Sequence, residues 1–272
     1  MFWKQIQDLP DKRFKRLTGV SKAVFQEMRQ SVMAHQQKHR KHPTRGKPPK
    51  LGLEDKLLVM LMYYREYRTY EHIGMSESRV CEIVQAMERI LIADKRFHLP
   101  GKRQLLQSDS EIEVVLIDVS ETPIERPKKK QRQYYSGKKK KHTLKTQVIA
   151  EKKTRKIIAT AFSKGRRHDL NLFKQSRTTI HPAIKTQTDT GYQGIQKLHN
   201  NAELPKKRSK KNPLAKTDKK QNQQISSSRV AIENIIRELK IFRILAEKYR
   251  NRRRRFSLRF NLIAAFLNLS IK

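Results

Sequence analysis

The apolar run VVLI at residues 114–117, followed directly by Asp118, places the strongest constraint on the fold of this chain. A continuous apolar run rich in β-branched side chains predicts a strand that is buried on both faces. Helices must then cover both sides of the sheet that contains it. The run therefore predicts an α/β architecture.

The segments after this strand alternate between strand and helix patterns. Further strands are expected at residues 143–152, 156–165, 183–189 and 202–207. Helices are expected at residues 168–180, 192–201 and 227–249, the last one after a solvated basic loop, KKRSKKNPLAKTDKKQNQQ. This order predicts a mixed five-stranded sheet flanked by helices.

The first hundred residues show helical patterns instead. Residues 12–38 predict a helix, with Ser21 as a candidate N-cap, and residues 53–67 predict another. Residues 39–52 are rich in lysine and proline and predict a basic linker between the two helices.

The segment after residue 67 has the pattern of a helix-turn-helix. Thr69 can cap a short helix, Gly74 breaks it, and Ser76 or Ser78 can cap a longer helix. Helix, tight glycine turn and helix are typical of DNA-binding helix-turn-helix units. An ordinary αα-hairpin fits the same spacing.

The charge of the chain indicates an anionic partner. Lys and Arg number 63 against 25 Asp and Glu, a formal net charge of +38. Nucleic acid is the leading candidate, and a ribosome-type or membrane-surface role is the next. Cys81 is the single cysteine, which excludes a disulfide framework and fits a reducing cytoplasm. The apolar segment 256–272 is interrupted by Arg259 and too short to span a bilayer, so no membrane partner is expected.

Three acidic residues occupy comparable positions in this basic chain. Asp118 ends the first strand of the α/β part, Asp189 ends a later strand, and Glu233 lies on the last long helix. Strand ends are where sites form in α/β sheets, and three carboxylates together would suit Mg²⁺ or Mn²⁺. On the helix, Arg229, Glu233 and Lys240 fall within about 40° of one another. Arg229 and Glu233 also fit an ordinary surface pair at i, i+4.

The run RPKKKQRQYYSGKKKKH at residues 126–142 is a candidate DNA-binding segment. Lys138, Lys139, Lys140 and Lys141 can neutralise phosphates, and the adjacent tyrosines can stack on unpaired bases. A solvated charge run is the alternative interpretation. Because the run follows the strand that carries Asp118, we expect it to flank the carboxylates.

Four motifs resemble those of a known family. They are IDVSETPIERPKKKQRQYYSGKKKKHTLKTQVIAEKKTRKI, GRRHDLNLF, TDTGYQG and RVAIENIIRELKIFRIL, in that order. Together they resemble the DDE transposases of bacterial insertion sequence family five, which are akin to Harbinger-type nucleases. The resemblance extends from Leu53 to the C-terminus.

The resemblance implies an RNase H-like catalytic domain in which Asp118, Asp189 and Glu233 are catalytic and bind two Mg²⁺ or Mn²⁺ ions. A family signature with basic residues on the last helix maps onto Arg229 and Lys240 as DNA contacts, although Ser226 stands where relatives have Tyr. We expect residues 1–100 to be the helical DNA-binding region and residues 101–272 the catalytic domain.

The function that the resemblance implies is DNA transposition. Such an enzyme cleaves the terminal inverted repeats of its element and joins the 3′-OH ends to target DNA. Its partners would be double-stranded DNA and a second copy of itself, as a homodimer or larger assembly. Its location would be the bacterial cytoplasm, associated with the nucleoid. Two alternatives are a Harbinger-type endonuclease without strand transfer and a catalytically decayed copy that binds DNA.

Overall fold

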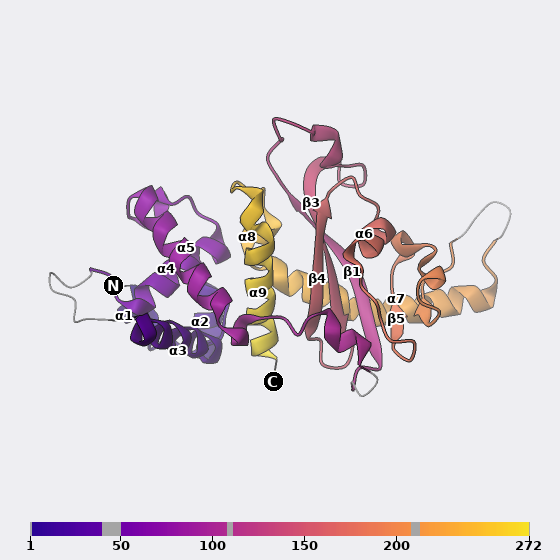
Figure 1. The fold of residues 1–272 in the computed structure, drawn as a ribbon, viewed down its shortest axis with the longest axis horizontal. Helices are drawn as coiled ribbons and strands as arrows, with labels where there is room; N and C mark the ends of the chain where they lie inside the picture. Colours follow the sequence, from indigo (N-terminus) through magenta and orange to yellow (C-terminus); the bar gives the residue numbers. More distant parts are fainter. Residues whose placement is uncertain (1, 40–49, 108–110, 208–212, 272) are drawn as a thin grey trace.

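The computed structural model describes residues 2–39, 50–107, 111–207 and 213–271. Most of the predicted linker at 39–52 lies outside the described residues. Within them, a group of helices at the N-terminal end adjoins a mixed sheet, and the last helices of the chain lie between the two (Figure 1).

The N-terminal region is built from five helices. Their bounds are α1 Phe2–Ile6, α2 Asp11–Thr18, α3 Lys22–His39, α4 Leu53–Glu66 and α5 Glu77–Ala93. The single helix expected at 12–38 is wrong, because Gly19 adopts a left-handed φ of 87° and ends α2. Ser21 then caps α3 as predicted, accepting a hydrogen bond from the Val24 N–H at 3.3 Å.

The predicted helix-turn-helix after residue 67 consists of a short 3₁₀ helix and α5, and it directly follows α4. The 3₁₀ helix Glu71–Ile73 ends at Gly74, whose φ is 81°, and α5 begins directly after Ser76. Gly74 therefore provides the turn that the sequence predicts.

The sheet has six strands, one more than expected. Their bounds are β1 Val114–Pro123, β2 Tyr135–Ser136, β3 Lys141–Glu151, β4 Ile157–Lys164, β5 Lys185–Gln187 and β6 Ala202–Glu203. β1 pairs antiparallel with β3 and parallel with β5, β3 also pairs with β4 and with the two-residue β2, and β5 pairs with β6. A strand as short as β2 leaves no alternating pattern in the sequence, which explains why it was not expected.

The helices of the α/β part differ in length from the expected ones. They are α6 Asp169–Ser176, α7 Lys216–Lys240, α8 Arg243–Ala246 and α9 Phe256–Ser270. The prediction of a loop up to residue 224 and a helix from 227 to 249 is wrong. The chain from Leu214 to the end of α7 contains neither Gly nor Pro, so its polar residues continue the helix. Phe242 then leaves the helix with extended backbone and is buried, which separates α7 from α8.

Six 3₁₀ helices complete the described secondary structure besides Glu71–Ile73. They are Lys95–Phe97, Lys102–Leu106, Gln131–Gln133, Thr190–Tyr192, Ile195–Lys197 and Arg253–Arg255.

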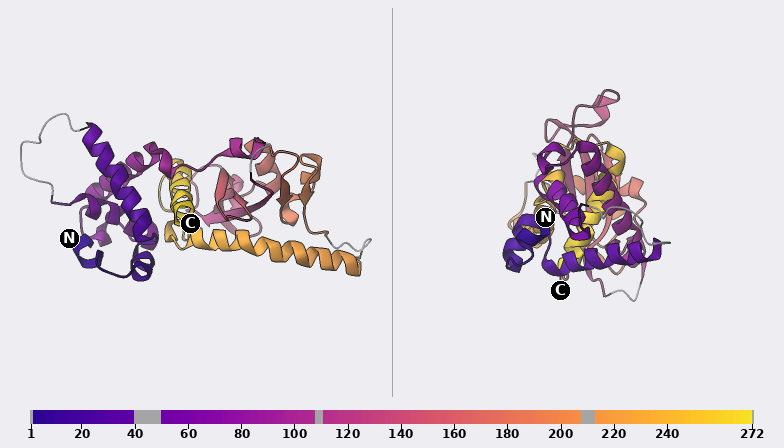
Figure 2. Two further views of the ribbon diagram at one scale, coloured as in Figure 1. Left: turned by 90° about the horizontal axis from the view of Figure 1, so that it is seen from below. Right: turned by 90° about the vertical axis from the view of Figure 1, so that its left-hand side faces the viewer.

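The sheet separates two apolar cores. On one face, Val148 and Ala150 of β3 belong to the core that contains residues of α7 and α9. On the other face, Ile149 packs with Phe173 of α6 and Tyr192. Figure 2 shows α7 running along one side of the sheet, opposite α6. The buried strand β1 thus has helices on both sides, as its apolar run predicts.

The helix α9 joins the N-terminal helices to the sheet. It packs against α3 and α5 on one side and against β4 on the other (Figure 1). In its first turn, Arg259 donates to the fully buried carboxylate of Glu88 on α5 at 2.6 Å. The predicted division of domains at residue 100 stays a prediction, since α9 shares a core with helices on the other side of it. No helix in the described part of the chain has the length and apolar character needed to cross a membrane.

Candidate active site

The three predicted carboxylates line a single cleft of about 290 Å³. Asp118 comes from β1, Asp189 from the turn after β5, and Glu233 from the middle of α7. The cleft is also lined by Lys138, Lys139, Arg229 and Lys240. Residues from four separate parts of the sequence therefore meet at one place.

The pairing of β1 with β5 explains why the two aspartates are neighbours. The last parallel register pair is Leu116 with Gln187, and Asp118 and Asp189 each lie two residues further along. Asp118 is not at the end of its strand, as the sequence suggested, because β1 continues to Pro123 beside β3. It lies instead where the parallel neighbour of β1 has ended, so the edge opens beside it.

The environment of Asp118 disfavours its charge. Its side chain is 18% exposed, and Val119 N–H donates to its Oδ1 at 2.8 Å. Burial raises the pKa of Asp118 to about 6, and the charges of Asp189 and Glu233 act in the same direction. The Val119 N–H and the guanidinium of Arg229 oppose the shift. A carboxyl with this pKa is ionised near neutral pH, at a cost that a nearby cation would relieve.

The guanidinium of Arg229 lies between two of the carboxylates. Its Nη2 is 3.8 Å from Asp118 Oδ2 and 3.9 Å from Glu233 Oε1. Arg229 is largely buried at 17% exposure, whereas Glu233 is 58% exposed. Arg229 therefore partly balances the charge of Asp118, and it is more than a surface partner of Glu233.

A contact between α7 and β5 holds the helix against the sheet. Ser228 Oγ donates to Gln187 Oε1 at 2.6 Å, one residue before Arg229. Ile232 and Ile235 are buried on the core side of the helix. Glu233 is thereby held at the boundary between core and solvent, as helical spacing predicts.

The turn after Asp189 is packed against a second acidic residue, Asp169 of α6. Asp189 Oδ1 accepts a hydrogen bond from Gly191 N–H at 2.9 Å. A Cβ atom at Gly191 would lie 2.7 Å from Asp169 Oδ2, so only glycine fits there without displacing a carboxylate. The sequence analysis did not predict this contact. The available signal was the first glycine of TDTGYQG, Gly191.

Asp169 is itself held by a buried lysine from β3. Lys145 Nζ lies 2.7 Å from Asp169 Oδ1 and 3.9 Å from Glu121 Oε1. It also donates to the Arg167 carbonyl at 2.8 Å. Asp169 lies in the first turn of α6, inside the helix expected at residues 168–180. Its ion pair with Lys145 joins elements that are far apart in sequence.

The basic residues predicted to bind DNA fall into two groups. Lys138, Lys139, Arg229 and Lys240 line the cleft, whereas Lys140 and Lys141 do not. Lys240 Nζ donates to the Glu121 carbonyl at 3.4 Å. Burial and the neighbouring charge of Lys139 lower the pKa of Lys240.

The tyrosines of the basic run differ in their availability. Tyr134 has the cations of Lys164 and Arg253 over its ring, at 5.5 and 4.6 Å from the centroid. Tyr135 is 42% exposed and contacts His142 edge-on. Of the two, Tyr135 is the one that remains open to a nucleic-acid base.

A closed set of metal ligands is absent from the described residues. No three His, Cys, Asp or Glu side chains among them lie close enough together to hold a metal ion. The guanidinium of Arg229 lies between two of the carboxylates, those of Asp118 and Glu233.

Sequence comparisons show the family to which the chain belongs. A sequence model described as "DDE superfamily endonuclease" matches residues 117–268, and one described as "Helix-turn-helix of DDE superfamily endonuclease" matches residues 49–94. The chain belongs to the DDE superfamily endonucleases. The resemblance predicted from the motifs is confirmed, as is an RNase H-like α/β fold preceded by a helix-turn-helix region.

One relative matches over almost the whole chain. It is a protein of Microchaete diplosiphon described as "Probable transposase for insertion sequence element IS702", 45% identical over 272 residues, with 98% of each chain covered. No solved structure matches this chain.

Proposed function

We propose that this chain is a DNA transposase that cleaves the terminal inverted repeats of an insertion element and joins the freed 3′-OH ends to target DNA. The two reactions would be metal-dependent phosphodiester hydrolysis and transesterification. The observation that carries the proposal is the meeting of Asp118, Asp189 and Glu233 in one cationic cleft. The name of the 45% identical relative supports the same function.

The donor set of the cleft suits a hard divalent cation. Carboxylate oxygens are the ligands that Mg²⁺ and Mn²⁺ prefer. The pKa of Asp118 is raised to about 6 chiefly by burial, with a further contribution from the charges of Asp189 and Glu233, and a bound cation would offset both. Arg229 Nε is buried without a hydrogen-bond partner among the described atoms, whereas Nη2 of the same guanidinium lies near Asp118 and Glu233. We propose that Asp118, Asp189 and Glu233, which line the cleft, hold two such ions.

Bound divalent ions would activate the attacking oxygen and stabilise the leaving oxygen in phosphodiester exchange. The residues of the chain would position the DNA. Lys138 and Lys139 would neutralise phosphates beside the scissile bond, and Lys240 would hold a DNA oxygen in line for attack. Arg229 would orient Asp118 and Glu233 through its two contacts.

The helical region would bring the element ends to this cleft. We propose that residues 1–100 bind DNA, with the helix-turn-helix at 49–94 as the sequence-reading element. The two ends of an element must be held together for transposition, so a homodimer or larger assembly on DNA follows from the same proposal.

The test is incubation of the full chain with Mg²⁺ or Mn²⁺, a duplex carrying the native element ends, and a supercoiled plasmid target. We expect cleaved ends and joined products that appear with metal and disappear with a chelator. Cleavage without joining would indicate an endonuclease that lacks strand transfer. Binding without cleavage under any metal would indicate a DNA-binding copy without catalysis.

Substitution of each carboxylate connects the reaction to the cleft. Asp118→Ala, Asp189→Ala and Glu233→Ala should each abolish cleavage while DNA binding stays similar or becomes tighter, because the lysines carry the binding. Glu238→Ala is the matched control, since Glu238 lies exposed on the same helix and does not line the cleft. A carboxylate whose loss leaves the parent rate intact does not belong to the site.

A further inference from the structure

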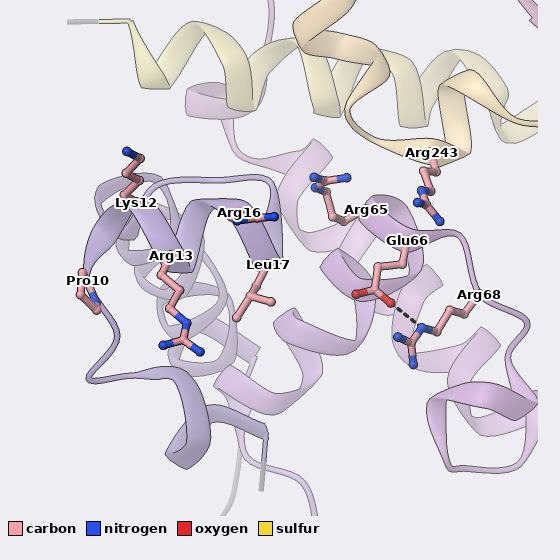
Figure 3. Close-up of a pocket in the computed structure, with 9 residues that line it drawn as sticks. All are labelled: Pro10, Lys12, Arg13, Arg16, Leu17, Arg65, Glu66, Arg68 and Arg243. Carbon is pink, nitrogen blue, oxygen red and sulfur yellow. Dashed lines mark ion pairs between the residues drawn. The ribbon is translucent and has the colours of Figure 1, made fainter.

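A second cationic surface lies outside the carboxylate cleft. It is a groove of about 970 Å³ between α2, the C-terminal end of α4 and the start of α8. Figure 3 shows the side chains of α2 on one side of it, and those of the α4 end and α8 on the other. Its lining contains six cations, namely Lys12, Arg13, Arg16, Arg65, Arg68 and Arg243. Glu66 is the one acidic residue of the lining.

The cations of α2 are free to bind a ligand. Glu66 pairs with Arg68, and Arg65 Nη1 donates to the Ile241 carbonyl at 2.6 Å. Lys12, Arg13 and Arg16, in contrast, are exposed and make no ion pair or side-chain hydrogen bond with any residue that the structure describes. Three mutually repelling cations without an acidic partner favour the binding of an anion.

The amphipathic build of α2 presents these cations together. Phe14 and Thr18 are buried against the helical core, which fixes the rotation of the helix. At about 100° per residue, positions 12, 13 and 16 fall within roughly 100° of one another on the opposite side. The same core contacts that fold α2 therefore hold its cations on the groove.

The chemistry of the lining selects phosphate groups on a long ligand. Guanidinium groups bind phosphate oxygens in a planar, bidentate manner, and five of the six cations are arginines. The cations come from α2, from the end of α4 and the residues after it, and from α8. A set spread over these elements suits an extended ligand with several anionic groups. A DNA backbone provides such a row of phosphates without any requirement on sequence.

The groove adjoins both DNA-handling parts of the chain. Arg65 and Arg68 belong to the stretch matched by the helix-turn-helix family, residues 49–94, whereas α2 and Arg243 lie outside it. Arg243 is three residues after Lys240, which lines the carboxylate cleft. DNA in the groove would therefore lie against the junction between α7, which carries Glu233, and α8.

Two packed contacts fix the N-terminal helices to that junction. Arg65 donates to Ile241, as described, and Gly19 lies against Phe242 so closely that a Cβ atom there would be 2.5 Å from the ring. The groove is thus held in a set position relative to the end of α7.

We propose that this groove binds the phosphate backbone of duplex DNA next to the segment that the helix-turn-helix reads, and so holds the element end in register with the carboxylate cleft. This inference rests on the proposed function and adds to it a second, sequence-independent DNA site on α2 and α8.

The first test compares two triple variants of the full chain in DNA binding at several salt concentrations. Lys12→Ala/Arg13→Ala/Arg16→Ala should make the slope of log K against log salt less steep by about 2.7, at about 0.9 for each lost phosphate contact. Lys216→Ala/Lys219→Ala/Lys220→Ala removes the same charge from an exposed part of α7 that lines neither the groove nor the cleft. We expect it to change the slope by less than about 1. Equal changes in the two variants would overturn the proposal.

The second test locates the DNA directly. Leu17 lines the groove and is 42% exposed, so Leu17→Cys with Cys81→Ser provides one attachment point for a DNA-cleaving iron chelate without removing a cation. We expect cuts at a fixed distance outside the sequence that the helix-turn-helix protects. A chelate at Lys219→Cys should give no such cuts. If the parent protein binds DNA but the chelate at position 17 gives no localised cuts, the proposed groove is overturned and the proposed function is not. If the parent protein does not bind DNA, the proposed function is overturned as well.

Discussion

Asp169 and Gly191 pack closely together behind Asp189, although they come from α6 and from the turn after β5. A side chain at Gly191 would begin 2.7 Å from Asp169 Oδ2 and 2.9 Å from Asp189 Oδ1. Gly191 therefore lies between the carboxylates of Asp169 and Asp189, and Lys145 Nζ holds the Asp169 carboxylate at 2.7 Å.

Gly191→Ala should lower the cleavage rate by roughly a hundredfold, because moving a reacting group by about 1 Å costs that much. DNA binding and its salt dependence should stay at the parent values, since no cation is removed. Single-turnover cleavage and anisotropy on the same preparation measure the two effects. Gly137→Ala is the control, because nothing lies within 4 Å of a Cβ atom at Gly137. Parent-rate cleavage by Gly191→Ala would show that this packing does not position Asp189.

The contrast between Asp189 and Asp169 shows how far the sequence alone reaches. Asp118 and Asp189 could be predicted because each comes directly after a short strand-like run, and Glu233 because it lies on the last long helix; the structure brings the three to one cleft. The roles of Asp169 and Lys145 depend on the pairing of β3 beside β1 and on the place of α6, which no local pattern encodes.

The errors in the predicted elements have local causes. The polar segment at the start of α7 has no apolar stripe, so its sequence predicted a loop. It is helical because it contains no Gly or Pro that would end the helix. The cationic groove could not be predicted at all, since Arg16, Arg65 and Arg243 lie on three helices that are far apart in sequence.

Asp118 should make the metal-free protein less stable above about pH 6. Its folded-state pKa of about 6 exceeds the ordinary value of 3.8, so the protonated form is the one that folding favours. The stabilising contribution is complete below about pH 3.8 and is lost as pH rises through about 6. Asp118→Asn keeps an acceptor for Val119 N–H and removes the charge.

The variant Asp118→Asn should therefore exceed the parent in free energy of unfolding by about 1–3 kcal/mol above pH 7 in chelator, with the lower part of this range favoured by the partial exposure of the side chain. The difference should shrink as pH falls toward about 4. Urea unfolding at a series of pH values measures it. A constant difference across this range would contradict the origin of the effect in Asp118.

The buried carboxylate of Glu88 should be the main electrostatic support of the joint between α5 and α9. It accepts from Arg259 Nε at 2.6 Å, from Arg255 Nε at 2.8 Å and from Tyr64 OH at 2.9 Å, and it is fully buried. Glu88→Gln leaves the Arg259 charge buried without its anion, which should cost about 3–5 kcal/mol of unfolding free energy.

Glu82→Gln on the same helix is the control for this change. Glu82 is 66% exposed and pairs with Arg79 at 3.1 Å, so its loss should cost less than about 1 kcal/mol. Glu88→Met combined with Arg259→Met should recover part of the lost stability, because the more deeply buried of the two cations paired with Glu88 is gone and the other, Arg255, is partly exposed. Similar losses in Glu82→Gln and Glu88→Gln would show that the buried network contributes little.

The lysines of the basic run should separate into two functional pairs. Lys138 and Lys139 line the carboxylate cleft, whereas Lys140 and Lys141 do not. Each double alanine variant should make the salt slope of DNA binding less steep by up to about 1.8. Only the Lys138/Lys139 variant should also slow cleavage at saturating DNA. Equal cleavage rates in the two variants would mean that the cleft lysines act in binding alone, and an unchanged slope would mean that the run is solvated.

Lys240 should contribute to the reaction more than to DNA affinity. Its ammonium lines the cleft, lies 3.4 Å from the Glu121 carbonyl, and shares the helical face of Arg229 and Glu233. Lys240→Ala should slow cleavage or joining by roughly tenfold to a hundredfold, because a misplaced DNA oxygen reacts slowly. Binding should change little, since many other cations contribute to it. Arg237→Ala is the control, since Arg237 is exposed on the same helix and does not line the cleft.

Arg229→Ala should act differently from Lys240→Ala, because Arg229 contacts Asp118 at 3.8 Å and Glu233 at 3.9 Å. Its loss removes the group that orients both carboxylates, so a higher concentration of Mg²⁺ or Mn²⁺ should be needed for half-maximal cleavage. The rate at saturating metal should fall less than in Lys240→Ala. Metal titrations of both variants beside the parent and Arg237→Ala measure the two parameters separately. If Lys240→Ala cuts and joins at the parent rate, the site reduces to the three carboxylates. If Arg229→Ala responds to metal as the parent does, its guanidinium has no part in arranging them.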